Sequence, residues 1–267
     1  MTVPTRGTRK GMKAKPARRV LLATVVLTVL PFAVSCGDQE HGGAGGSAAA
    51  GPPALARSGS HLVITTENGL LLRPTDGRRV TVDDRADGDW SHDGDTWTLD
   101  LSCTDRERAR GEEACPRMPY VKVPGGVSVT VSARDAGVDV AGLAAALDVT
   151  TVNGDVTVTR SGKGDAAVRL ATRNGSVRAT ALDAGRLHAA TTNGDVILAC
   201  ATAPTGVTAA TTNGSVGVTV PHDAPAYLVT AGTDNGRATV GVTTSDDRQG
   251  PAMTLTTVNG DVDVRRA

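Results

Sequence analysis

The sequence of 267 residues predicts an all-β protein whose main part is a β-solenoid, a stack of coils of about 20 residues with two strands each. First, a Thr-x-Asn-Gly pattern recurs with gaps of 21, 19, 20, 22 and 24 residues between successive asparagines, and such a period indicates a repeat architecture. Second, apolar and polar residues alternate on both sides of each Asn-Gly, which predicts half-buried strands. Third, only five residues are aromatic, so Val, Leu, Ala and Thr must fill a thin core. The repeated pairs are Asn153-Gly154, Asn174-Gly175, Asn193-Gly194, Asn213-Gly214, Asn235-Gly236 and Asn259-Gly260.

Residues 1–35 have the three parts of a signal peptide. Seven Lys and Arg residues and no acid precede an apolar run from Val20 to Val34, and small residues follow it. The run is interrupted by Pro31 and is shorter than the roughly 20 residues that a membrane-spanning helix needs. We therefore expect a cleaved signal, exported through the general route or, because of Arg18-Arg19, through a twin-arginine route.

The sequence Ala33-Val34-Ser35-Cys36 resembles a bacterial lipobox, although Leu is usual where Ala33 stands. This resemblance implies cleavage before Cys36 and attachment of fatty-acyl chains, palmitate among them, to that cysteine. An ordinary signal followed by an incidental cysteine is the alternative. Residues 36–60 begin with the lipid anchor that this resemblance implies. The rest of the segment is rich in Gly, Ala, Ser and Pro without apolar periodicity, which predicts a flexible tether.

The charge of the mature chain argues against nucleic acid as a partner. Removing the seven basic residues of the leader leaves 21 basic residues against 28 acidic ones, a net charge of −7 from Cys36 onward. A phosphate backbone needs a basic surface. We expect the partners to be the membrane, through the lipid anchor, and an unidentified protein or envelope polymer.

An N-terminal β region is expected over residues 61–125, before the Asn-Gly repeat domain of residues 126–267. Cys103 and Cys115 flank a polar run, and in an oxidising compartment we expect them to form a disulfide. Trp97 alternates with Leu99 and Leu101 and is expected in the core. Trp90 lies outside that register, which makes it a possible ligand contact.

Two architectures fit the repeat arithmetic. Asn-Gly is a strong signal for a two-residue hairpin, which would give an antiparallel meander. In a solenoid, each residue instead stacks on its copy in the next coil, and Thr and Asn, two residues apart, would both form inward rows. The repeated Thr favours the solenoid, because hairpin geometry does not require it. Helix is not expected, with Ala141 to Leu147 as the one doubtful stretch.

A family resemblance rests on these residues. Tyr120-Val121-Lys122-Val123-Pro124, then Val127 to Val131, Gly137-Val138-Asp139-Val140 and the Asn-Gly-Asp-Val units resemble the putative-adhesin β-strand-repeat family, whose function is unknown. The resemblance covers residues 120–267 well and 61–119 loosely. It implies a solenoid-like fold in a bacterial envelope protein, and it supplies no catalytic residues.

Residues that could perform chemistry are scattered. The recurring acids Asp155, Asp195 and Asp261 could suggest calcium, but Ser and Arg interrupt the series, so an exposed row is expected. His92 among neighbouring aspartates belongs to a solvated turn, and Cys200 follows an inward alternation. We expect no metal, no cofactor and no enzymatic activity. The predicted function is a non-enzymatic, surface-exposed lipoprotein with an interaction or scaffold domain; the alternative is an accessory or sensory lipoprotein that binds a small ligand or a membrane protein through residues 61–119.

Overall fold

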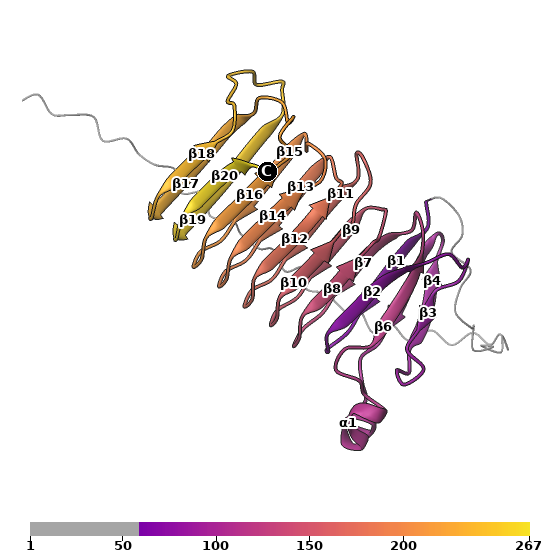
Figure 1. The fold of residues 1–267 in the computed structure, drawn as a ribbon. Coiled ribbons are helices and arrows are strands. Elements are labelled where there is room, and N and C mark those ends of the chain that lie inside the picture. The colour runs from indigo at the N-terminus through magenta and orange to yellow at the C-terminus, as the bar shows by residue number, and fades with distance from the viewer. Residues whose placement is uncertain (1–58) are drawn as a thin grey trace, which may run out of the picture. The chain divides into compact units, whose positions relative to one another are not determined.

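A computed structural model describes residues 59–267, which form two β-sheets of ten strands each, packed face to face (Figure 1). The strands of sheet 1, in spatial order, are β17 (Leu228–Asn235), β19 (Ala252–Asn259), β15 (Gly206–Ala210), β13 (Arg186–Ala190), β11 (Ala167–Ala171), β9 (Leu147–Thr150), β7 (Ser128–Ser132), β1 (His61–Thr65), β5 (Thr96–Asp100) and β4 (Asp89–Asp93). The strands of sheet 2 are β18 (Ala238–Gly241), β20 (Val262–Arg266), β16 (Val216–Val220), β14 (Val196–Cys200), β12 (Val177–Leu182), β10 (Val156–Thr159), β8 (Val138–Ala141), β2 (Leu70–Thr75), β6 (Tyr120–Pro124) and β3 (Thr81–Val82).

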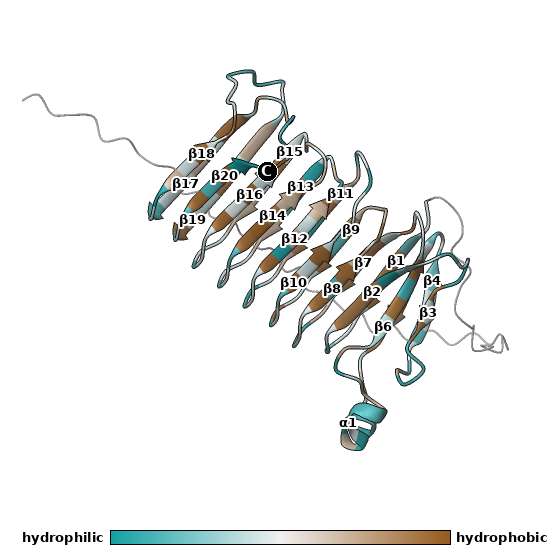
Figure 2. Ribbon diagram, in the orientation of Figure 1, coloured by the Kyte–Doolittle hydropathy of each residue, from teal (hydrophilic) through white to brown (hydrophobic). Residues whose placement is uncertain are grey.

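Each coil contributes one strand to each sheet, and neighbouring coils pair in parallel and in register. Val149 of β9 lies beside Leu170 of β11, and Val156 of β10 lies beside Val177 of β12. Every second side chain points between the sheets, so these columns form one continuous core of Val, Leu and Ala. Figure 2 shows the apolar residues repeated along the strands. The predicted β-solenoid is therefore confirmed, and the antiparallel meander is wrong for the repeats.

The coils do not stack in chain order at either end. The first coil, β1 and β2, lies between the coil of β5 and β6 and the coil of β7 and β8. The last coil, β19 and β20, lies between the coil of β15 and β16 and the coil of β17 and β18. Among the described strands, only β3 and β4 pair antiparallel to their neighbours, β6 and β5. The solenoid thus contains strands from residues 61–125 as well as from the Asn-Gly repeats.

Two short helices interrupt the strands of the described chain. Helix α1 spans Asp105–Arg110 and the 3₁₀ helix η1 spans Gly111–Glu113. Thr104 and Glu107 form a capping box at the start of α1, a Thr-x-x-Glu signal that is visible in the sequence. The doubtful stretch from Ala141 to Leu147 is not helical, because it contains the end of β8 and the start of β9.

Candidate interaction surfaces

The Asn-Gly corners are held by two rows of hydrogen bonds that run from coil to coil. Thr191 is buried, and its Oγ1 donates to the Gly175 carbonyl at 2.8 Å; five other threonines make the equivalent bond to the neighbouring coil. The asparagines form the second row, in which each Nδ2 donates to the Oδ1 of the next asparagine at 2.8–2.9 Å. The row ends at Asn153, whose Nδ2 donates to Asp135 at 3.1 Å. These bonds explain why Thr and Asn recur together.

The asparagine row is exposed, so the expectation that both rows face inward is wrong for Asn. Thr151 follows the end of β9 and is buried, whereas Asn153 lies in the corner before β10 and is exposed. Side chains alternate between faces only while the backbone stays extended. Because the chain bends at the corner, the two-residue spacing from Thr to Asn no longer places both on one face.

Glycine follows each asparagine because the corners lie against one another. Gly194 has φ of 144°, and a Cβ atom there would lie 2.1 Å from the Gly175 carbonyl oxygen. A side chain would therefore force neighbouring coils apart. The glycines let the coils approach to the normal spacing of parallel strands.

The residues after the glycines form a third row that links coils through backbone amides. The Asp195 carboxylate accepts from the Ser215 amide at 2.9 Å, and the Ser215 hydroxyl accepts from the Asp261 amide at 3.2 Å. In spatial order this row reads Asp155, Ser176, Asp195, Ser215, Asp261 and Arg237. Acids and hydroxyls alternate, which keeps like charges two coils apart. The row satisfies backbone donors, and the described residues contain no group of three or more His, Cys, Asp or Glu suited to a metal ion.

A shallow groove on the outer face of sheet 1 is a surface that the sequence did not reveal. It has a volume of about 460 Å³ and crosses β11, β13, β15 and β19. Gly206 has no side chain there, which leaves a gap between Arg186 and Ala252 in the same row. Arg169 and His188 lie along the next row. The groove therefore combines small residues such as Gly206 and Ala252 with two arginines, in a domain whose net charge is negative.

Burial and the neighbouring charges fix the ionic state of this groove. Desolvation raises the pKa of Asp148 in spite of Arg169, whose Nε lies 4.0 Å from the carboxylate. Desolvation, followed by the charge of Arg169, lowers the pKa of His188. His188 is therefore neutral near pH 7. The positive charge of the groove comes from its arginines.

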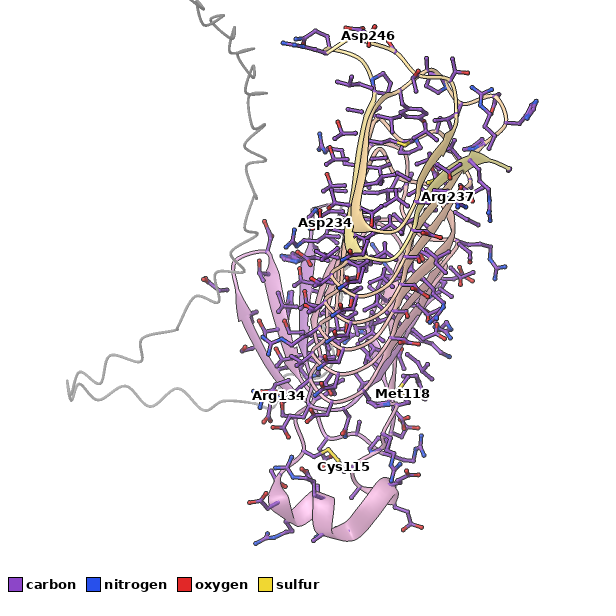
Figure 3. The ribbon with its side chains drawn as sticks, turned by 90° about the vertical axis from the view of Figure 1, so that its left-hand side faces the viewer. Cys115, Met118, Arg134, Asp234, Arg237 and Asp246 are labelled. Carbon is purple, nitrogen blue, oxygen red and sulfur yellow. A yellow bond between two sulfur atoms is a disulfide. The ribbon has the colours of Figure 1, made fainter. Side chains whose placement is uncertain are left out.

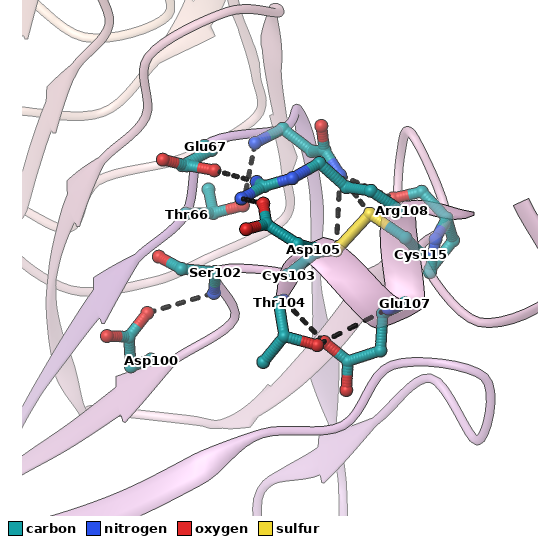
Figure 4. A network of polar contacts seen from close by, with 12 residues as sticks. Thr66, Glu67, Asp100, Ser102, Cys103, Thr104, Asp105, Glu107, Arg108 and Cys115 are labelled. Carbon is teal, nitrogen blue, oxygen red and sulfur yellow. Dashed lines mark hydrogen bonds and ion pairs between the residues drawn. A yellow bond between two sulfur atoms is a disulfide. The ribbon is translucent and has the colours of Figure 1, made fainter. Parts of the chain in front are cut away.

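The loop bearing α1 is attached to the solenoid by a disulfide and by a network of polar contacts (Figure 4). Cys103 and Cys115 are bonded, with their Cα atoms 5.9 Å apart. Asn68, in the Asn-Gly corner between β1 and β2, donates from Nδ2 to the Cys115 sulfur at 3.1 Å. Arg108 of α1 forms ion pairs with Glu67 and Asp105. The loop connects β5 to β6, so it takes the place of an Asn-Gly corner in the coil next to Asn68.

Trp90 lies beside a second hollow near the end of the solenoid that β3 and β4 form. It is half-buried on β4, packs against the core and contacts Trp97 edge to face at 6.4 Å between centroids. The hollow has a volume of about 480 Å³ and is lined by Trp90, Val82 and the buried Asp83, among others. Trp97 is half-buried as well, whereas Leu99 and Leu101 are buried. Trp90 is therefore partly available to a ligand and partly a core residue.

His92 and Cys200, which the sequence analysis considered for chemistry, pack against neighbouring side chains. His92 contacts the Trp97 ring at 4.6 Å between centroids. Cys200 is half-buried against the core after a register shift between β12 and β14, and desolvation raises the pKa of its thiol to about 12. Cys36, the signal peptide and the spacer up to residue 58 lie outside the described residues. Within residues 59–267, no helix is long and apolar enough to cross a membrane.

Stacked Asn-Gly corners with buried Thr and exposed Asn rows define a parallel β-solenoid of repeat units. Residues 90–265 match the family model described as Toastrack DUF4097, and the chain belongs to this family. The resemblance to a β-strand-repeat family of unknown function is thereby confirmed. None of the curated proteins matches the chain significantly.

Two solved structures resemble the chain at low sequence identity. A putative cell adhesion protein from Clostridium sporogenes is 8% identical, with 80% of this chain and 95% of that chain covered and a TM-score of 0.38. A putative adhesin from Bacteroides fragilis is 10% identical, with 80% and 94% covered and a TM-score of 0.34.

Proposed function

We propose that this protein is a non-enzymatic lipoprotein that presents a β-solenoid outside the cytoplasm as an interaction or scaffold module. Cys36 is the proposed lipid attachment point and residues 37–60 the spacer. The anchor part of the proposal is supported by the basic, apolar and small-residue order of residues 1–35. The interaction part is supported by the outer face of sheet 1, where the groove around Gly206 and Arg186 forms a recessed patch on a regular surface.

The partner proposed for this groove is an envelope protein or polymer that carries acidic groups. Arg169 and Arg186 offer bidentate hydrogen bonds to carboxylate or phosphate groups, and the partly exposed His188 adds a polar contact. Thr208 and Thr254 line the same groove with hydroxyls. A long, repetitive face of this kind suits an extended partner, because several coils contribute equivalent positions to one surface.

Affinity capture from intact cells tests the interaction. The full chain serves as bait beside two variants: Arg169→Ala with His188→Ala in the groove, and Arg178→Ala on the outer face of sheet 2 as the matched control. Arg178 pairs with Asp155 at 3.0 Å and is about as exposed as Arg169. The groove variant should lose the captured partner and the control should keep it. Equal capture by both variants would refute the assignment of the groove.

Cell fractionation tests the anchor separately. Cys36→Ser should move the protein from the membrane fraction to the soluble extracytoplasmic fraction and abolish incorporation of labelled palmitate. Cys200→Ser, which changes the half-buried cysteine of β14, should leave both unchanged. Retention of Cys36→Ser in the membrane fraction would show that another segment holds the protein there.

A second candidate function is an accessory or sensory role in which residues 61–119 bind a small ligand. The observation that favours it is the hollow beside Trp90, where an aromatic ring is half-exposed next to a recess. Deleting residues 61–119 is not a usable test, because β1, β2 and β5 are inner strands of the solenoid. Trp90→Ala is the appropriate change, with His92→Ala as control. Loss of ligand-induced thermal stabilisation in the first variant alone would favour this function.

A further inference from the structure

The core of the solenoid is open to solvent at the end formed by β17 and β18. Val240 belongs to an inward column of sheet 2 in which Leu198, Val218 and Val264 are at most 1% exposed. Val240 itself is 40% exposed, because no further coil of the described chain covers it. In sheet 1, Val229 is half-buried, whereas its neighbour Met253 is buried. The end therefore displays a cross-section of the apolar core.

The opposite end differs, since β3 and β4 close it. Both strands run antiparallel to their neighbours, and Val82 and Trp90 pack against the core there. The outermost strand β4 carries exposed Asp89, His92 and Asp93. Charged outer strands and capping segments protect solenoid ends from further pairing. The antiparallel strands β3 and β4 therefore protect one end of the described solenoid from further strand pairing, whereas the parallel strands β17 and β18 form the other end.

Backbone groups at the open end lack a β-strand partner within residues 59–267 along most of β17. The Leu228 amide donates to the Pro251 carbonyl on the side of β19. Alternate residues of a strand direct their amides and carbonyls to opposite sides, so those of Val229, Ala231 and Thr233 point to the open side. The segment around Thr244 pairs only with Tyr227, at the start of the strand.

Charges at the two corners of this end are complementary to each other. Asp234 and Arg237 flank the Asn235-Gly236 corner, and Asp246 lies in the loop at the other end of the strands (Figure 3). Arg248 follows two residues later in the same loop. Among the described residues, none of these four takes part in an ion pair. A two-fold axis that reverses the strands would place Arg237 of one copy near Asp246 of the other, and Asp234 near Arg248.

We propose that the β17–β18 end is a homotypic docking surface, on which a second copy of this chain continues both sheets by antiparallel pairing. A second copy supplies two strands at the same sheet spacing, an equal apolar cross-section and the complementary corner charges. With sheets about 10 Å apart and strands about 15 Å long, the apolar cross-section is roughly 150 Å² per copy. Stable interfaces bury about 800 Å² per partner, so this association is weak and depends on concentration.

Sedimentation velocity of the full chain in detergent, from about 1 to about 500 μM, tests the proposal. The wild type should shift reversibly from monomer to dimer. Val240→Lys should raise the dissociation constant at least about tenfold, because it places a charge on the docked core. Ile197→Lys is the control: Ile197 is 44% exposed on the outer face of β14, away from the open end. A wild type that stays monomeric throughout, or equal dimerisation by the two variants, would overturn the proposal.

Charge reversal keeps the proposal testable should Val240→Lys fold poorly. Arg237→Glu and Asp246→Arg should each weaken the dimer by about tenfold, and the double variant should restore it to within about threefold of the wild type. Additive weakening in the double variant would contradict the antiparallel arrangement. The result does not depend on Cys36, because the docking end lies wholly within residues 227–251.

Discussion

Substituting Gly194 by alanine perturbs the contact on which coil stacking depends. The added Cβ would lie 2.1 Å from the Gly175 carbonyl oxygen, and φ of 144° disfavours any residue with a Cβ. A sparsely populated backbone conformation costs about 1–3 kcal/mol, and overpacking adds about 1–3 kcal/mol. We therefore expect Gly194→Ala to lower the free energy of unfolding by about 4 kcal/mol. For a domain of this size, that corresponds to a fall in melting temperature of about 8–16 °C.

Gly217→Ala is the matched control for this experiment. Gly217 lies in β16, and a methyl group added there would have no other atom within 4 Å, so it meets open solvent. We expect a change within about 0.5 kcal/mol, or a slight gain from the lower entropy of the unfolded chain. Thermal unfolding followed by circular dichroism compares both variants with the wild type. If Gly194→Ala is as stable as Gly217→Ala, the corners do not touch and the stacking argument fails.

Three further perturbations test other contacts. Thr191→Val should cost about 1–2 kcal/mol in urea unfolding, because a carbonyl of the neighbouring coil loses its hydroxyl donor; an unchanged midpoint would contradict this. Replacing both Cys103 and Cys115 by serine should make the loop between them sensitive to protease, and reducing agent should do the same for the wild type, while the coils stay protected; equal resistance would show that the disulfide does not hold the loop. The hydrogen bond from Arg85 lowers the pKa of buried Asp83, so the stability that this carboxylate contributes is present above the ordinary pKa of about 3.9 and is lost as the pH falls through the lower folded value. Melting curves should therefore show Asp83→Asn less stable than the wild type at pH 7 and equal to it in strong acid, and a constant difference at all pH values would refute this.

The sequence was sufficient to predict the solenoid because its stacking contacts use the same residue types in every coil. Thr191 donates to the glycine carbonyl of the adjacent corner, and Asn193 donates to the asparagine at the same position in the next coil. The need for Thr and Asn therefore repeats with the period of the coil. Hairpins would need only the turn residues. The recurrence of a Thr two residues before each Asn was therefore informative about parallel stacking.

The order of the coils was harder to predict, although one signal of it exists. Along the chain, the residues after the last Asn-Gly pairs read Ser215, Arg237 and Asp261, which breaks the alternation of acid and hydroxyl. Moving the last coil next to Ser215 restores that alternation, as the structure shows. The repeat period alone could not reveal the stacking order, because the strands of any coil can pair with those of any other. Which coils become neighbours depends on contacts between residues far apart in the sequence.

The groove and the exposed asparagine row also lay beyond sequence reasoning. The groove depends on Gly206 standing beside Arg186 of another coil, a relation across the sheet that no local pattern encodes. Whether the Asn193 side chain points into the core or to solvent depends on where the chain bends within the corner. Sequence periodicity identifies the faces of strands, but it does not fix side-chain directions where strands end.

Disulfide trapping across the corners tests the stacked solenoid and its coil order most directly. In a Cys200→Ser background, cysteines replace Asn213 together with either Asn259 or Asn235. Residues in adjacent parallel coils lie about 4.8 Å apart, within the range that a disulfide spans, whereas two coils separate Asn213 from Asn235 by about 10 Å. Oxidation should therefore join positions 213 and 259 and leave 213 and 235 free. A bond between 213 and 235 would show stacking in chain order, and no bond in either pair would contradict the parallel solenoid itself.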